Sequence, residues 1–330
     1  MDDRSFALNV AKAIHSTSPD AGIIALQPNS SEHFDVSETG IVTAIPFDAE
    51  PFQLEHAVAE AVHLVKHSIH PNLVSFLPAK AGSGCSTVVL NTAIALSRSF
   101  HKNVLVLEAD LRSGVISSAL SCPRRGSIQQ ALASAHELDA FRWNRFISTH
   151  AGVDWLLSDR SLPAAPPDWS HYFGIMQFAL PRYDCVLVDL PELVNPGTAE
   201  IVRASSRIHV VNTQEMMTLT LANQRFAELA SWGIPTDRIG VLLNRLENKI
   251  PTRADVERLL QQPVSAAFPN DYIACQASIS DGVPIAEETL LGIAFTQFAA
   301  QLIGTTPMLP RAKQKLISKW FQNLSTGYAR

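Results

Sequence analysis

The stretch AKAGSGCST, at residues 79–87, carries residue types suited to binding phosphate groups. It follows an apolar run and opens a helical pattern, so main-chain N–H groups there can surround anionic oxygens with the help of the helix dipole. Gly82 and Gly84 allow the backbone to approach a ligand closely. A hydroxyl from Ser86 or Thr87 is a suitable ligand for a magnesium ion. The stretch therefore predicts a phosphate site built by Ala81, Gly82, Ser83, Gly84, Cys85, Ser86 and Thr87.

This stretch departs from the standard phosphate-loop motif at two positions. The motif would place Gly at position 79 and Lys at position 85, where this sequence has Ala79 and Cys85. A lysine is instead present at the start of the loop, as Lys80. The alternative interpretation is a simple Gly/Ser turn between a strand and a helix.

Two acidic segments favour the phosphate site over the simple turn. Glu108 and Asp110 end the next apolar strand, and Asp189 ends a later one. In an open parallel sheet, ligands bind beyond the carboxyl ends of the strands. We therefore expect the glycine loop and these carboxylates to converge at one edge of the sheet.

The elements that must position these residues alternate between apolar strands and helices. Strands are predicted at 73–77, 103–110, 153–158, 183–191, 207–213, 238–245 and 264–269. Helices are predicted at 88–100, 127–140, 218–232, 253–261 and 288–303. This alternation indicates an α/β domain with a mostly parallel sheet and helices on both faces. We assign it to residues 71–305, between an N-terminal segment at 1–70 and a C-terminal segment at 306–330.

Composition narrows the class of protein further. The net charge of −5 and the lack of a basic patch in the core domain argue against a nucleic-acid partner. The four cysteines are scattered without metal-ligand spacing, which favours a reducing compartment. The acidic N-terminus does not read as a signal peptide, and no run reaches the roughly 18 apolar residues that a spanning helix needs. We therefore expect a cytoplasmic location.

These motifs resemble those of the MinD/ParA superfamily. KAGSGCST is similar to the superfamily's deviant Walker A motif, and EAD at 108–110 and VLVDLP at 186–191 resemble its further acidic motif and its Walker B motif. FPNDYIACQASISDGVPI at 268–285 resembles a segment of the CpaE/TadZ branch, which serves pilus assembly. The resemblance covers residues 72–305 and implies a P-loop NTPase fold.

The resemblance also implies roles for single residues, with ATP and Mg²⁺ as cofactors. Lys80 matches the lysine that reaches across an ATP-bridged homodimer. Ser86 matches a magnesium ligand, and Asp189 matches the acid that holds the metal's water. The residues that would lie against the adenine base are Asn244, Pro269 and Asn270.

Two departures from the family pattern bear on hydrolysis. Cys85 replaces a lysine that would contact the β- and γ-phosphates, and Glu108 replaces the aspartate expected to orient the attacking water. Lys80, Glu108 and Asp110 remain the candidate catalytic residues. Loss of one preorganised charge typically slows a reaction about 10²- to 10³-fold. The sequence therefore predicts a degenerate ATPase that binds ATP with slow or absent hydrolysis.

The first seventy residues resemble the last three βα steps of a response-regulator receiver domain. Helical spacing at 5–16, strands at 22–26 and 40–48, and a helix at 53–66 fit that order. Pro46-Phe47-Asp48 resembles the end of a receiver domain, although Ile45 stands where its lysine would be. The half that would hold the phosphoacceptor has no room, which argues against phosphotransfer. The alternative is an extension unrelated to receivers.

The C-terminal segment 311–330 has the pattern of a basic amphipathic helix. Its apolar side chains fall on one helical face, with Lys313 and Lys319 beside them; they are Leu316, Ile317, Trp320, Phe321 and Leu324. Such a helix can lie in an anionic membrane surface or bind a partner protein. The alternative is a terminal helix packed on the core.

Three functions remain open on the sequence alone. The first is a localisation or assembly factor for a Tad-type pilus or secretion machine, with the proteins of that machine as partners. The second is a bacterial tyrosine kinase of the same superfamily, which EADLR at 108–112 favours; Tyr328 is, however, the only tyrosine in the last fifty residues. The third is a ParA-like DNA partition factor, which lacks support from a basic patch.

Overall fold

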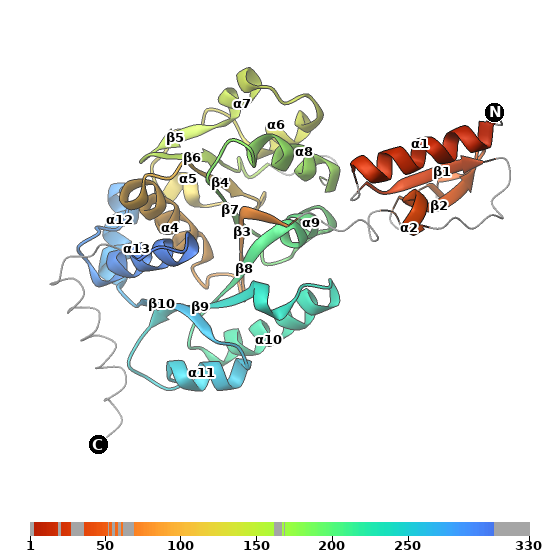
Figure 1. Ribbon diagram of the computed structural model, residues 1–330. Coiled ribbons are helices and arrows are strands. Elements are labelled where there is room, and N and C mark those ends of the chain that lie inside the picture. The colour runs from red at the N-terminus through yellow and green to blue at the C-terminus, as the bar shows by residue number, and fades with distance from the viewer. Residues whose placement is uncertain are drawn as a thin grey trace. The chain divides into compact units, whose positions relative to one another are not determined.

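The structure is a computed structural model that describes residues 3–18, 21–27, 36–51, 53–54, 57–58, 61, 69–161, 167 and 169–306. The chain divides into two compact units, Met1–Ser68 and Ile69–Arg330 (Figure 1).

The second unit is organised around one eight-stranded sheet with the strand order β10-β9-β8-β3-β7-β4-β6-β5. Seven strands run parallel, and β5 at one edge pairs antiparallel with β6. The strands are β3 (His70–Pro78), β4 (Val104–Glu108), β5 (Ser148–His150), β6 (Val153–Leu156), β7 (Cys185–Asp189), β8 (Ser205–Asn212), β9 (Ile239–Leu246) and β10 (Val264–Pro269). The predicted mostly parallel sheet is confirmed.

Two hydrophobic layers, one on each face, hold helices against this sheet. Side chains alternate along a strand, so Leu105 and Leu107 of β4 join one layer while Val104 and Val106 join the other. On the second face, α4 (Cys85–Phe100) packs side by side with α13 (Leu290–Leu302), as Figure 1 shows. The first face is covered by α6 (Ile128–Ala133), α8 (Trp169–Ala179), α9 (Pro196–Ala204), α10 (Met216–Ser231) and α11 (Arg253–Leu260).

The prediction of one continuous helix over 127–140 is wrong, because the structure has two separate helices in this region. Helix α6 begins at a capping box formed by Ser127 and Gln130 and ends at Ala133. A short 3-10 turn, Ala135–Glu137, follows, and Asp139 then caps the separate helix α7 (Ala140–Phe146). Two N-caps within one apolar pattern split it, because each cap accepts backbone N–H groups that a continuous helix would bond internally. Four further helices of this unit were not predicted, namely α5 (Ile116–Ala119), α8, α9 and α12 (Tyr272–Asp281), and neither was the edge strand β5.

The first unit contains α1 (Asp3–Thr17), β1 (Ile23–Gln27), α2 (Val36–Thr39) and β2 (Ile41–Pro46). Strands β1 and β2 form a parallel two-stranded sheet, with Leu26 opposite Ile45. The described residues between 51 and 61 are helical. Helix α1 and the two strands match predicted elements, whereas α2 between the strands was not predicted. The resemblance to a receiver remains a prediction.

The segment 311–330, predicted as a basic amphipathic helix, lies outside the described residues. Among the helices that the structure does describe, none combines the length and the apolar character required to cross a bilayer.

Candidate nucleotide-binding site

A cavity of about 800 Å³ opens at the carboxyl ends of β3, β4 and β7. Its walls come mainly from the residues that follow these three strands, 81–87, 109–113 and 189–193, with Arg245 contributed by β9. Ligands of open parallel sheets bind at this position. The cavity therefore brings together the glycine stretch and two of the acidic residues, Asp110 and Asp189, that the sequence singled out.

The phosphate loop, residues 79–87, is shaped by two glycines in the left-handed region. Gly82 has φ 81°, and Gly84, which precedes the first turn of α4, has φ 87°. A Cβ atom on Gly84 would meet the side-chain nitrogen of Asn244 at 2.3 Å, so only glycine fits there. No side chain caps the N-terminus of α4, which leaves its first N–H groups to a ligand. This cradle of unpaired donors fits an anionic phosphate group.

One buried polar atom in the phosphate loop also fits a phosphate ligand. The hydroxyl of Ser83 is 2% exposed at the residue level and has no hydrogen-bond partner among the described residues. Buried hydroxyls are normally paired, because an unpaired one loses its hydration without compensation. A phosphate oxygen would supply the missing partner.

The floor of the cavity holds a buried carboxylate next to two side chains of α4. Asp189 is 2% exposed and hydrogen bonds with the hydroxyl of Ser86 and the thiol of Cys85. Burial raises the pKa of the Asp189 carboxyl to about 7, and the carboxylates of Glu108 and Asp110 add to this rise. Burial, reinforced by Asp189, also raises the pKa of the Cys85 thiol well above its usual range. A hydroxyl beside a cluster of carboxylates is the donor set of a hard cation such as Mg²⁺.

Asp110 lines the cavity and also shapes its own turn. Its carboxylate accepts the backbone N–H groups of Arg112 at 3.1 Å and Ser113 at 2.8 Å. The turn places both of these residues in the cavity wall. Asp110 therefore faces the candidate ligand and holds the residues beside it.

Glu108 lies outside the cavity wall, although it pairs with Asp189 across the neighbouring strands β4 and β7. Its side chain is fully buried, and its carboxylate accepts the N–H groups of Ile116 at 2.8 Å and Ser158 at 2.9 Å. Burial raises the pKa of the Glu108 carboxyl, and these backbone donors oppose the rise. In this geometry, Glu108 fastens the residues after β4 to the end of β6 rather than facing a water in the cavity.

Lys80 is exposed and does not line the cavity. Asn244 lies beneath the phosphate loop, where its side-chain nitrogen donates to the carbonyl oxygen of Ser83 at 2.9 Å and its oxygen accepts the N–H of Arg245 at 3.0 Å. In this structure Asn244 therefore contacts the phosphate loop, and it is absent from the cavity wall.

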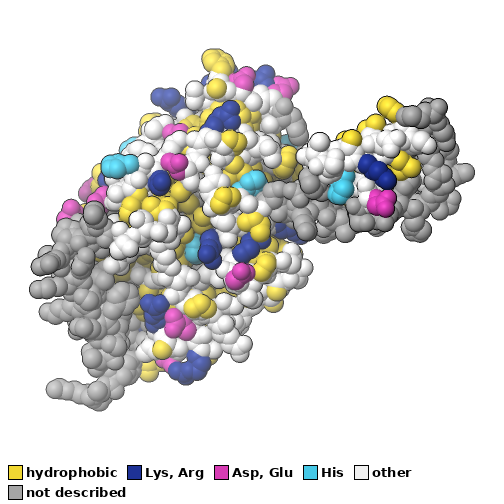
Figure 2. Space-filling view, in the orientation of Figure 1, with side chains coloured by type: hydrophobic (Ala, Val, Ile, Leu, Met, Phe, Trp, Pro, Cys, Tyr) yellow, Lys and Arg dark blue, Asp and Glu magenta, His cyan; other side chains and the backbone are white. Residues whose placement is uncertain are grey.

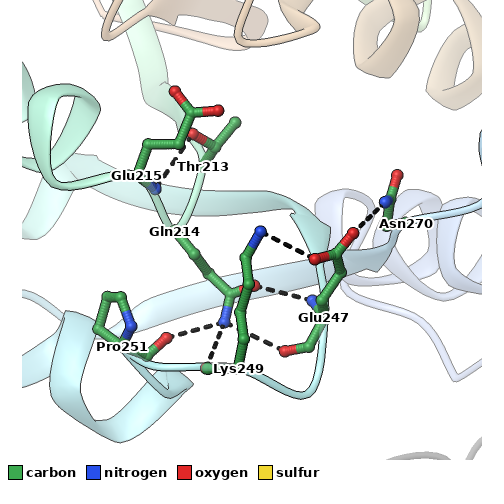
Figure 3. A network of polar contacts seen from close by, with 7 residues as sticks. All are labelled: Thr213, Gln214, Glu215, Glu247, Lys249, Pro251 and Asn270. Atoms are coloured by element: carbon green, nitrogen blue, oxygen red, sulfur yellow. Dashed lines mark hydrogen bonds and ion pairs between the residues drawn. The ribbon is translucent and has the colours of Figure 1, made fainter.

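Pro269 and Asn270 stand at the end of β10, also outside the cavity wall. The side chain of Asn270 donates to the carboxylate of Glu247, as Figure 3 shows. The amide of Gln214 fixes the segment after β9 by donating to the carbonyl oxygens of three residues, Glu247, Lys249 and Pro251. These hydrogen bonds link the segments that follow β8, β9 and β10.

Three charged residues of the cavity wall had no predicted binding role, namely Arg112, Glu192 and Arg245. Arg245 directly follows Asn244, and Arg112 ends the stretch EADLR, two residues after Asp110. A basic residue at or just after the carboxyl end of a strand was the available signal, because that end is where ligands bind.

Comparisons with known proteins agree with this fold. No family model matches the chain. The septum site-determining protein MinD of Thermotoga maritima is 21% identical over 234 residues, which are 65% of this chain and 80% of that protein. A ParA family ATPase from Chlorobium tepidum has a TM-score of 0.63 at 22% identity, covering 69% of this chain and 98% of that one. MinD from Pyrococcus horikoshii, solved in complex with Mg-ADP, has a TM-score of 0.54 at 20% identity, covering 69% and 94%.

The sheet order, the loop before α4 and the cavity at the strand ends give the second unit a P-loop NTPase fold. Within that class its fold is that of the MinD/ParA superfamily, and the predicted resemblance to this superfamily is confirmed.

Proposed function

We propose that this protein binds ATP together with Mg²⁺ in the cavity after β3, β4 and β7. The observation that carries the proposal is the contact of Ser86 with the buried Asp189 at the floor of a glycine-shaped phosphate loop. Main-chain N–H groups would hold the phosphates, the hydroxyl of Ser86 would ligate the metal, and Asp189 would hold the metal's water. The Mg-ADP complex of the Pyrococcus horikoshii MinD supports the same cofactor class.

We also propose that hydrolysis is slow or absent. Cys85, where a lysine would neutralise developing charge, is buried against Asp189. The carboxylate of Glu108 accepts hydrogen bonds from two backbone N–H groups and does not face the cavity. Each lost preorganised group slows a reaction about 10²- to 10³-fold. Turnover as fast as that of an intact MinD-type ATPase would contradict this part of the proposal.

A homodimer bridged by ATP completes the nucleotide part of the proposal. Lys80 is exposed at the phosphate loop and lies outside its own cavity wall, which supports a role toward a second copy. Calorimetric titration of ATP and ADP with magnesium, paired with mass measurement of the oligomer, tests binding and dimerisation together. Lys80→Ala should weaken ATP-driven dimerisation more than binding to the monomer. Lys102→Ala, just beyond the far end of α4, is the matched control.

The cellular role that we propose is a localisation or assembly factor for a Tad-type pilus or secretion machine, in the cytoplasm or at the inner face of the membrane. The support is the resemblance of residues 268–285 to the CpaE/TadZ branch. In the structure this segment forms the end of β10 and α12, where Tyr272 and Ile273 are exposed and accessible to a partner. Liposome co-sedimentation with and without residues 311–330 tests the membrane contact, and equal sedimentation would remove it.

Two direct assays test the two alternative functions, a tyrosine kinase and a DNA partition factor. Autophosphorylation from labelled ATP would replace the proposal with a tyrosine-kinase function. Retention on DNA would replace it with a partition function. On the face shown in Figure 2, Lys and Arg side chains are dispersed among acidic ones, which favours neither a DNA surface nor a single basic docking site.

A further inference from the structure

The cavity has a shortage of positive charge at the position where a phosphate-loop lysine would stand. Cys85 occupies that position, and its thiol is buried against Asp189. The cavity wall also carries the carboxylates of Asp110, Asp189 and Glu192. A triphosphate entering this site would meet repulsion that Mg²⁺ offsets only in part.

Among the described residues of the cavity wall, two carry positive charge, Arg112 and Arg245. Neither guanidinium has a hydrogen-bond or carboxylate partner in the described part of the chain. A guanidinium is the side chain best matched to phosphate oxygens, because its fork of N–H donors binds them bidentately. Both residues are exposed and therefore accessible to a ligand.

Of these two arginines, Arg245 is the one whose side chain lies near the phosphate loop. Its guanidinium Nη2 lies 4.0 Å from the position that a Cβ atom on Gly84 would occupy. Arg245 has φ 53°, an uncommon conformation for a residue other than glycine, asparagine or aspartate. Asn244 holds this conformation by accepting the N–H of Arg245 at 3.0 Å while it donates to Ser83.

The burial pattern of β9 supports the same orientation. Every residue of this strand is buried except Arg245. The pairing of β9 with β10 also shifts register between Ala267 and Pro269, whose partner is Leu246. Arg245 is therefore the one exposed side chain of β9, and it lies next to the phosphate loop.

On the basis of the proposed nucleotide site, we propose that Arg245 binds a phosphate of the nucleotide and replaces the charge that Cys85 does not supply. The replacement comes from the end of β9 instead of the first turn of α4. Asn244 is the positioning residue that couples the guanidinium to the phosphate loop.

A double-mutant cycle tests this replacement. Binding of Mg-ATP is measured by calorimetry for the wild type, Arg245→Ala, Cys85→Lys and the variant with both changes. Arg245→Ala should weaken binding about 10- to 100-fold, the loss of one charge-assisted contact. In the Cys85→Lys background, the same change should weaken binding less than about threefold, because the new ammonium takes over the charge.

Several controls separate binding from folding. Arg245→Lys keeps a point charge and should recover part of the lost affinity. Arg258→Ala, on α11 and outside the cavity wall, should bind as the wild type does. Thermal unfolding without nucleotide should give Arg245→Ala the same Tm as the wild type, while the rise in Tm caused by Mg-ATP should shrink.

Three results would overturn the inference. Wild-type affinity in Arg245→Ala would remove the contact, and an equal loss in both backgrounds would remove the replacement of Cys85. A wild-type protein that binds no nucleotide would refute the proposed function and this inference with it. A binding wild type with an unaffected Arg245→Ala would refute this inference alone.

Discussion

The side-chain amide of Asn244 donates a hydrogen bond of 2.9 Å to the carbonyl oxygen of Ser83. This bond joins β9 to the phosphate loop, and the same side chain accepts the N–H of Arg245. Its removal would leave two backbone groups unpaired at the edge of the cavity. The shape of the loop therefore depends on a residue that does not line the site.

We expect Asn244→Ala to weaken Mg-ATP binding about tenfold and to destabilise the domain by about 1–3 kcal/mol, because the buried carbonyl of Ser83 and the partly buried N–H of Arg245 both lose their bond. Calorimetric titration and urea unfolding check the two effects. Asn223→Ala, an exposed asparagine on α10, is the control and should change neither quantity. Unchanged binding in Asn244→Ala would show that the loop keeps its shape without this bond.

Gly84→Ala should destabilise the nucleotide-free protein more than Gly82→Ala. Both residues are left-handed, so an alanine at either position costs roughly 1–3 kcal/mol in backbone strain. Only at Gly84 would the added Cβ also collide with Asn244, at 2.3 Å, whereas nothing lies within 4 Å at Gly82. Urea unfolding of the two variants without ligand measures the difference. Equal losses would mean that Asn244 can move away.

Replacement of Glu108 should loosen the segment after β4. Glu108→Ala leaves the buried N–H groups of Ile116 and Ser158 without acceptors, at a cost of about 1–3 kcal/mol for each group. Hydrogen exchange followed by mass spectrometry should show faster exchange at both amides. Asp110→Ala, which removes an acceptor from the amides of Arg112 and Ser113, should leave the exchange of Ile116 and Ser158 slow. Slow exchange at these two amides in Glu108→Ala would contradict the role assigned to this carboxylate.

His209 should make the protein less stable as the solution becomes more acidic. Its imidazole is buried between Phe76 and Phe298, with ring centroids 5.4 and 5.1 Å away, and neither ring nitrogen has a partner among the described residues. Burial, reinforced by Arg207, lowers the pKa of His209 to about 3, against about 6.5 when unfolded. The unfolded chain therefore binds the extra proton first, and stability falls as the pH drops from about 6.5 toward 3.

The difference between wild type and His209→Leu isolates this effect. The variant should gain unfolding free energy relative to the wild type as the pH falls below about 6.5, by at most about 1.4 kcal/mol for each pH unit. The comparison is needed because Asp189, whose pKa is raised to about 7, acts in the opposite direction between about pH 4 and 7. Urea unfolding at several pH values measures the difference. A constant difference across this range would contradict the prediction.

The strands were predictable because most of them are buried on both faces. Runs such as VLVLE and CVLVD are apolar at nearly every position, and the structure has them as β4 and β7. Their carboxyl ends then fixed where Asp110 and Asp189 would lie. Helix α12 could not be found in this way. It has no buried residues, so no apolar stripe marks it.

The direction of the Glu108 side chain could not be predicted from the sequence either. Its position at the end of β4 is correct, and the motif around it suggested a side chain facing the ligand. The direction is set by Ile116 and Ser158, which lie 8 and 50 residues away and whose N–H groups need an acceptor. Gly114 makes room for this arrangement, because a Cβ there would lie 2.6 Å from the carboxyl carbon of Glu108.

The bond from Asn244 to Ser83 spans 161 positions of the chain. During synthesis, the glycine turn leaves the ribosome long before the strand that sets its final form. In the finished sheet, β9 is joined to β3 only through β8. The loop can therefore gain this bond only after β9 has been made, and a nascent chain that stops short of β9 would have the loop without its hydrogen bond to Asn244.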